Sequence, residues 1–100
     1  MHEASHARFA LGVVVATPGS LEAFNSSGEQ PAPFLKRHMA GDWGLVDVDD
    51  SKANETALED GSRILSAYNL RSGERIWIIT EAVGDDGRRA STCILLPDEY

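Results

Sequence analysis

The stretch Arg75-Ile76-Trp77-Ile78-Ile79-Thr80 decides the fold of this chain, because four bulky apolar residues follow one another between polar ends. β-Branched and aromatic residues in so short a run predict a buried strand. Successive side chains of a strand point to opposite faces of its sheet. Ile76 and Ile78 therefore share one face, and Trp77 and Ile79 share the other. The stretch predicts a central strand that is apolar on both faces.

Two neighbouring segments continue this pattern. Residues 63–70 and 91–96 are also rich in apolar residues, and only turns or short polar loops separate them from the central stretch. Short connections are typical of antiparallel strands. We therefore expect the last forty residues to form an antiparallel meander.

The first half of the chain begins with a further strand at residues 9–16, with Phe9, Leu11, Val13 and Val15 on one face. Three short helices are expected after it. Thr17 can cap the first helix, and Pro18 suits its first position because a missing N–H costs nothing there.

The second helix opens at Pro31 and Pro33, passes through Phe34 and His38, and ends at Gly41. The third helix begins after a cap at Asp49 or Asp50 and ends at Gly61. Asp-Trp-Gly at residues 42–44 forms the turn between them.

These elements predict an α+β fold in the order β-α-α-α-β-β-β. The sheet is expected to be antiparallel, with about four strands and with the three short helices inserted after the first strand. We expect residues 1–8 to be a flexible N-terminal segment and residues 9–100 to be a single α+β domain, because 100 residues leave no room for two cores.

A sheet that is apolar on both faces needs cover on both. Three short helices can cover one face, and a second copy of the chain is the simplest cover for the other. A homodimer is therefore one expectation. The alternative is that the N-terminal segment or the helices wrap both faces of the sheet.

The charge balance restricts the partners. Sixteen acidic residues against nine basic ones give a formal charge of −7. A negative field repels phosphate groups, which argues against direct binding to nucleic acid or to anionic membranes. The complementary partner is a basic or arginine-rich protein, such as one that itself binds nucleic acid. The simpler interpretation is that the charge keeps a small protein soluble.

The cysteine content and the apolar segments of the sequence indicate the cellular compartment and whether a cofactor is expected. Cys93 is the single cysteine, so an internal disulfide is excluded. The first eight residues contain no apolar segment of the kind found in secretion signals, and the longest apolar runs are too short to span a membrane. We therefore expect a cytoplasmic protein without a cofactor.

Two motif matches suggest metals. His2-Glu3-Ala4-Ser5-His6 fits the zinc pattern H-E-x-x-H, but it lies at the extreme N-terminus with no core-facing helix around it. The segment from Asp47 resembles a calcium loop, yet Lys52 and Leu58 stand where that loop needs glycine and glutamate. We expect neither match to bind a metal ion.

The most distinctive stretch is residues 38–44, which contains His38, Asp42 and Trp43. A histidine near a helix C-terminus could pair with Asp42, and Trp43 could form the wall of a small pocket. These three residues are the candidate pocket. The alternative is a helix end followed by a turn, with Trp43 anchored in the core.

A second candidate is an acidic segment with one base, Lys52. Its members are Asp42, Asp47, Asp49, Asp50, Glu55, Glu59 and Asp60. As an interaction surface, they could present carboxylates at the spacing of phosphates to a nucleic-acid-binding protein. As a solvated helix face, they need no function.

Several segments together carry a resemblance to known proteins. They are residues 9–19, residues 37–44, residues 76–82 and the C-terminal Ile94-Leu95-Leu96-Pro97-Asp98-Glu99-Tyr100. In these segments the chain is similar to small uncharacterised "plasmid-related" bacterial proteins carried on plasmids, integrative elements and prophages. The resemblance implies a setting, that of a mobile element in a bacterial cytoplasm. It implies no activity and no catalytic residues.

Two functions of different class remain. The first is a non-enzymatic protein-interaction module from a bacterial mobile element, with its acidic surface acting as an inhibitor of a host nucleic-acid-directed defence of the restriction or CRISPR type. Regulation of element transfer through a protein partner is a variant of it. The alternative is a small enzyme or ligand-binding domain centred on His38, Asp42 and Trp43. The sequence contains no recognisable catalytic constellation and favours the first.

Overall fold

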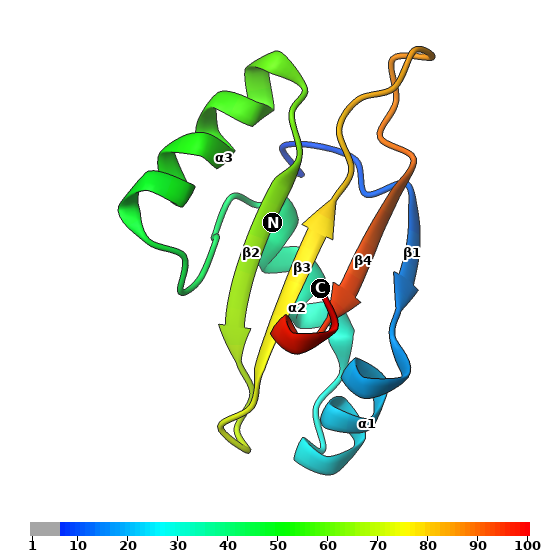
Figure 1. Cartoon of the computed structure of the whole chain (residues 1–100), viewed down its shortest axis with the longest axis vertical. Coiled ribbons are helices and arrows are strands. Elements are labelled where there is room, and N and C mark those ends of the chain that lie inside the picture. The colour runs from blue at the N-terminus through cyan, green and yellow to red at the C-terminus, as the bar shows by residue number, and fades with distance from the viewer. Residues whose placement is uncertain (1–6) are drawn as a thin grey trace, which may run out of the picture.

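The computed structural model describes residues 7–100 and has an α+β fold (Figure 1). Its elements are β1 Val13–Ala16, α1 Pro18–Ser27, α2 Pro31–Met39, α3 Val48–Asp60, β2 Ile64–Asn69, β3 Arg75–Thr80 and β4 Ser91–Leu95, followed by a 3₁₀ turn, η1, at Pro97–Glu99. The predicted α+β class and order of elements are confirmed. The zinc motif at residues 2–6 lies outside the described residues, as does most of the segment 1–8 that the sequence predicts to be flexible.

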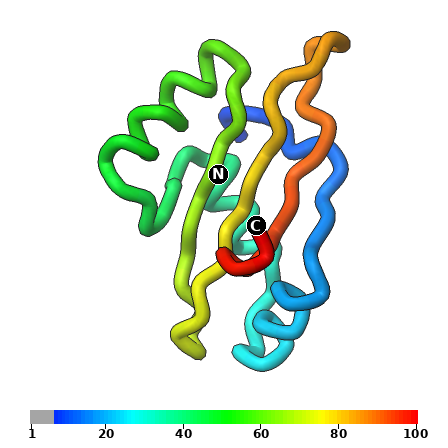
Figure 2. The backbone as a smooth tube through the Cα atoms, in the orientation of Figure 1, coloured from blue at the N-terminus to red at the C-terminus, as the bar shows by residue number. Residues whose placement is uncertain are grey.

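The sheet is mixed, so the prediction of an antiparallel sheet is wrong. The strand order is β1-β4-β3-β2, and β1 lies parallel to β4 at one edge (Figure 2). The strands β2, β3 and β4 do form the expected antiparallel meander. Short connections dictate antiparallel pairing for those three strands alone. Three helices separate β1 from them, and a connection of that length leaves the direction of β1 free.

The first strand is also shorter than predicted. It begins at Val13 rather than Phe9, because Gly12 has a positive φ of 67° and its backbone lies against the carbonyls of Arg89 and Ala90. A residue with a Cβ would clash there, so the chain bends at this glycine. Phe9 lies outside the strand, and its ring stacks on that of Trp43 at a centroid distance of 6.2 Å.

The caps of the helices follow local rules. Thr17 accepts a hydrogen bond from the Ser20 N–H at 3.1 Å, as predicted for the N-cap of α1. The N-cap of α3 is Asp47, not Asp49 or Asp50, because the Asp47 carboxylate accepts the Asp50 N–H at 2.8 Å. The predicted end of α3 at Gly61 is confirmed.

One face of the sheet carries the main core. The helices α1 and α2 lie against this face (Figure 1). Aromatic rings from both helices and from β2 meet there. The ring centroids of Phe24 on α1 and Phe34 on α2 are 5.7 Å apart, and those of Phe34 and Tyr68 on β2 are 5.5 Å apart. The other members of the cluster are Ala23, Leu70, Ile76, Ile78 and Ile94.

The second face is partly covered by the C-terminal turn of the same chain. Figure 1 shows η1 lying across β3 and β4, and the Tyr100 ring packs edge-on against Trp77. Ile79 and Leu95 are each only 6% exposed on this face. Leu65, Trp77 and Cys93 on the same face stay partly exposed, so the turn covers only part of this face. The predicted homodimer remains a prediction.

The outer edge of β2 is partly closed by the turn after α2. The Ala67 N–H donates to the Trp43 carbonyl at 3.1 Å, and the Ala67 carbonyl accepts the Leu45 N–H at 2.7 Å. Between them, Gly44 has a φ of 73°, and a Cβ at this position would meet the Ala67 carbonyl and the Tyr68 ring. This close approach fixes the chain beside β2 and sets the starting point of α3.

Replacing Gly44 tests this contact, with Gly28 as a matched control. Gly28 has nearly the same φ, 70°, but a Cβ at Gly28 would meet nothing within 4 Å. Gly28→Ala should lower the free energy of unfolding by about 1 kcal/mol, the cost of a left-handed residue. Gly44→Ala should lower it by about 2 kcal/mol more, because of the added overlap. Urea unfolding of both variants measures the difference, and equal losses would show that the approach at Gly44 is unimportant.

Candidate functional site

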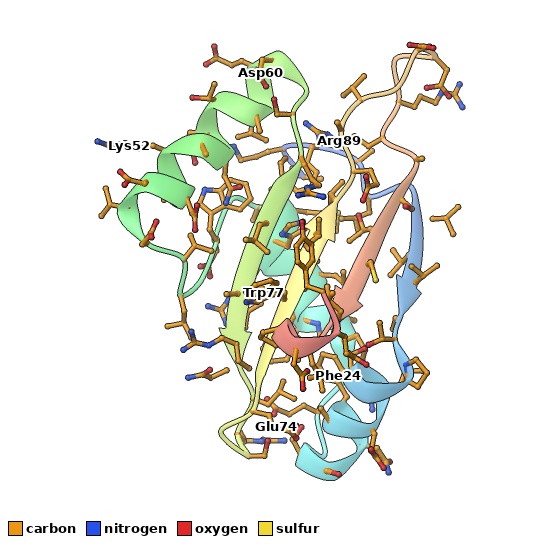
Figure 3. All side chains as sticks on the ribbon, viewed as in Figure 1. Phe24, Lys52, Asp60, Glu74, Trp77 and Arg89 are labelled. Carbon is orange, nitrogen blue, oxygen red and sulfur yellow. The ribbon has the colours of Figure 1, made fainter. Side chains whose placement is uncertain are left out.

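The acidic segment is built mainly on α3, which stands beside β2 at the edge of the sheet (Figure 1). Asn54 and Ala57 form its buried face, and the Asn54 side chain bonds both the N–H and the carbonyl of Leu65. Asp49 and Asp50 lie in the first turn, where carboxylates favour the positive end of the helix dipole. The opposite face points to solvent, and Figure 3 shows Lys52 extending away from the sheet.

Glu55 is used by the fold. Its carboxylate accepts the Trp43 Nε1–H at 3.0 Å and forms an ion pair with Arg8 at 2.9 Å. The hydrogen bond from Arg8, followed by that from Trp43, lowers the pKa of Glu55. The residue therefore anchors Trp43 and the N-terminal segment to α3, and it is only in part available to a partner.

Asp42 and Asp60 also have structural partners. The Asp42 carboxylate accepts from Arg37 Nε at 2.7 Å and from the Gly44 N–H at 3.2 Å, and the bond from Arg37 lowers its pKa. Asp60 accepts the Ser62 N–H at 2.9 Å just beyond α3, and hydrogen bonding to Ser62 lowers its pKa. Both carboxylates stabilise turns at the ends of helices.

The remaining acids face two different surroundings. Asp47 and Asp50 line a hollow of about 250 Å³ on the second face of the sheet, beside the start of α3. Asp49 does not line it. Glu59 instead lines a cavity of about 410 Å³ at the other end of α3, together with Phe9 and Arg88. The seven predicted acids thus do not form one surface.

The hollow beside Asp47 and Asp50 combines carboxylates with an aromatic wall. Trp77 lines it, as do the apolar residues Leu45, Val46, Leu65 and Ala67. One base, Arg75, also lines it, and its Nε donates to the Asn69 side chain at 3.2 Å. Carboxylates next to an aromatic face are the groups that receive a guanidinium or ammonium ion.

The structure brings together two of the three candidate pocket residues. The His38 ring meets the Trp43 ring edge-on, with centroids 6.1 Å apart. Asp42 turns away from His38 toward Arg37. His38 is 0% exposed and Trp43 is 5% exposed, so neither ring presents a surface to solvent.

His38 instead belongs to a chain of buried polar side chains. Its Nδ1 lies 2.5 Å from Ser66 Oγ on β2, and its Nε2 lies 2.9 Å from Thr80 Oγ1 on β3. Thr80 Oγ1 lies 2.7 Å from Thr92 Oγ1 on β4, which donates to the Leu11 carbonyl at 2.8 Å. We call these four side chains, His38, Ser66, Thr80 and Thr92, the polar chain.

The polar chain contains a histidine and a serine in hydrogen-bonding contact, as in a hydrolase. A nucleophile must also be reachable by its substrate and lie near oxyanion donors. All four side chains are fully buried. Burial lowers the pKa of His38 to about 4, with a smaller contribution from the charge of Arg89, so the imidazole is neutral at physiological pH. The arrangement is that of a structural network.

No pattern in the sequence predicts a structural role for Arg89. Its guanidinium donates to the carbonyls of Ser62 at 2.7 Å, Glu81 at 2.9 Å and Ala57 at 3.0 Å. It thereby satisfies the C-terminal end of α3 and ties that end to the loop before β4. Burial lowers its pKa. Arg88 and Arg89 are alike in sequence, and no local pattern shows which of them turns inward.

Two further features of residues 7–100 bear on the type of site. No group of three or more histidine, cysteine or acidic side chains gathers closely enough in this range to hold a metal ion. None of the helices in it has both the length and the apolar character that crossing a membrane requires.

Comparison of the chain with protein-family models, with curated proteins and with solved structures gives no match.

The burial of His38 predicts how stability depends on pH. Its pKa is about 4 in the fold, against an ordinary value of 6.5, so the unfolded chain binds more protons between these values. The neutral, buried His38 therefore leaves the free energy of unfolding at its full value above pH 6.5, and this free energy falls as the pH falls toward 4. From about pH 7 to about pH 5 we expect a loss of about 2 kcal/mol. Urea unfolding at each pH measures it.

The control is His38→Gln, which keeps a donor and an acceptor but does not titrate. This variant should lose less than half as much stability over the same range, whatever its stability at neutral pH. A loss equal to that of the unaltered protein would show that other groups cause the dependence.

Proposed function

We propose that this protein is a non-enzymatic interaction module whose partner is a basic protein, bound at the hollow beside the start of α3. The observation that carries the proposal is the placement of Asp47 and Asp50 in that hollow with Trp77. An arginine side chain of a partner would find carboxylates for its N–H groups and an indole beside its planar face.

The overall charge supports the same partner. A formal charge of −7 attracts a basic surface at long range and raises the rate of encounter. Basic surfaces are typical of proteins that bind nucleic acid. A module of this kind would compete with the nucleic acid for its partner.

The resemblance to plasmid-related proteins supports a bacterial mobile element as the source of this protein. A mobile element benefits from inhibiting a host defence that acts on nucleic acid, and restriction and CRISPR enzymes have the required basic grooves. We therefore propose that the partner is a component of such a defence in a bacterial cytoplasm.

The alternative is a small enzyme or ligand-binding domain centred on His38, Asp42 and Trp43. Such a centre needs a path from solvent to the imidazole. His38 has no exposed surface, and the Asp42 carboxylate is engaged by Arg37. These positions favour the interaction module.

Reversal of single charges tests the proposal. Asp50→Lys places a like charge against the basic partner inside the hollow, whereas Asp49→Lys makes the same change on a neighbouring residue outside it. Both lie in the first turn of α3, so their effects on the helix should be similar. Asp50→Lys should weaken partner binding at least about tenfold, and Asp49→Lys less than about threefold.

The measurement has two readouts. The first is the recovery of defence proteins from a lysate of a restriction- and CRISPR-proficient bacterium on the immobilised variants. The second is the survival of an incoming plasmid in that bacterium when each variant is expressed. The proposal would be contradicted if no defence protein were recovered and plasmid survival were unchanged. Equal losses for the two variants would place the interface outside the hollow.

A further inference from the structure

The strand β1 forms an edge of the sheet with apolar side chains in solvent. Val13, Val14 and Val15 are 67%, 42% and 47% exposed. The opposite edge, β2, is partly closed by the backbone of Trp43 and Leu45. For β1, the described residues 7–100 show strand pairing to β4 alone.

About half of the backbone N–H and C=O groups of β1 also do not bond to β4. Val13 and Thr17 donate their N–H groups to the carbonyls of Ala90 and Ile94, both at 3.0 Å. In a parallel pair, alternate residues direct both backbone groups toward the partner strand. Val14 and Ala16 must therefore direct their N–H and C=O groups outward, away from β4.

Natural edge strands usually carry a charged side chain, a proline or a bulge that prevents pairing with another chain. The sequence of β1, Val-Val-Val-Ala, contains none of these. Its only protection is its short length. Four apolar residues with outward backbone groups are suited to accept one more strand.

We propose that β1 pairs antiparallel with β1 of a second copy of this chain, so that the two sheets join into one. The outward groups set the register. Val14 of one copy exchanges two hydrogen bonds with Ala16 of the other, and Ala16 does the same in return. Val15 then lies on the two-fold axis, facing Val15 of the second copy.

The charges at the two ends of β1 favour this direction over a parallel one. Arg88 belongs to the loop that also carries Asp85 and Asp86, and it lines the same cavity as Gly12, the residue before the strand. The Glu99 carboxylate lies at the end of the strand, where it accepts the Thr17 hydroxyl at 2.6 Å. Hydrogen bonding to Thr17 lowers the pKa of Glu99, so it is ionised. Antiparallel pairing places the end of each strand that carries Arg88 beside the end of the other strand that carries Glu99.

A single cysteine at Val15 tests the register, with one at Val13 as its control. Facing residues at this kind of position have Cα atoms about 4.5 Å apart, close enough for a disulfide. The two copies of residue 13 would be about 13 Å apart, since each residue of a strand adds about 3.3 Å. Both variants also carry Cys93→Ser, because Cys93 lies next to Val15 in β4.

Under mild oxidation, Val15→Cys should form a covalent dimer at least about tenfold faster than Val13→Cys. Exposure alone predicts the reverse order, since Val13 is the more exposed residue. Equal rates, or faster dimerisation through position 13, would overturn the proposed register.

Sedimentation of the unmodified protein between about 1 μM and about 1 mM tests the association itself, because weak interfaces dissociate in this range. A dimer is expected at the upper end, and a monomer throughout would overturn the proposal. Val14→Pro removes an outward N–H and no bond to β4, so it should abolish the dimer. Val48→Pro, at the exposed first residue of α3, is the control and should leave the dimer unchanged. A dimer that survives Val14→Pro would place the interface elsewhere.

Charge pairing gives a test that does not depend on proline. Val15→Lys and Val15→Glu should each be monomeric, because like charges face each other on the axis. Mixed in equal amounts, they should form a dimer of one copy of each. Failure of the mixture to associate would contradict the proposal. None of these residues lines the hollow beside Asp47, so the outcome is independent of the proposed function.

Discussion

The buried imidazole of His38 holds the helical half of this protein to its sheet. Its two nitrogens bond Ser66 on β2 and Thr80 on β3, and Thr80 continues through Thr92 on β4 to the carbonyl of Leu11, just before β1. A buried polar group without a partner costs free energy, so every member of the polar chain depends on its neighbours. One arrangement of α2 against the strands satisfies them all. An apolar contact alone would allow the helix to slide.

The position of α2 then determines what stands at the edge of the sheet. The turn after α2 brings Trp43 into the core, and the Trp43 indole and Arg8 together hold Glu55 of α3. Arg89 binds the C-terminal end of the same helix at the Ala57 carbonyl and ties it to the carbonyls of Ser62 and Glu81 beyond it. The helix is thus held near its middle and at its C-terminal end, and residues at its start line the hollow on the second face of the sheet. Part of the acidic segment serves this architecture, and Asp47, which also caps α3, lines the hollow together with Asp50.

Much of the fold follows from local patterns. The run of residues 75–80 predicted β3 with the bounds that it has, because β-branched and aromatic side chains suit a buried strand. Thr17, Pro18 and Gly61 predicted helix ends, because each suits a particular backbone position. The acidic segment was visible as a charge run, but its division into structural carboxylates and hollow-lining carboxylates was not. That division depends on Arg8, Arg37 and Trp43, which are distant in sequence from some of the acids they bind.

The sequence by itself therefore determined the order of the elements, the α+β class, the N-cap of α1 and the end of α3, since these depend on neighbours within a few residues. The tertiary structure alone decided three other features. It placed β1 parallel to β4, it buried His38 in a polar chain rather than a pocket, and it turned Arg89 inward while Arg88 stayed exposed. Each of these depends on which backbone and polar groups meet once residues far apart in the chain come together. Hydrophobic periodicity cannot predict these contacts, because it indicates which face of an element a residue occupies and not which residue it contacts there.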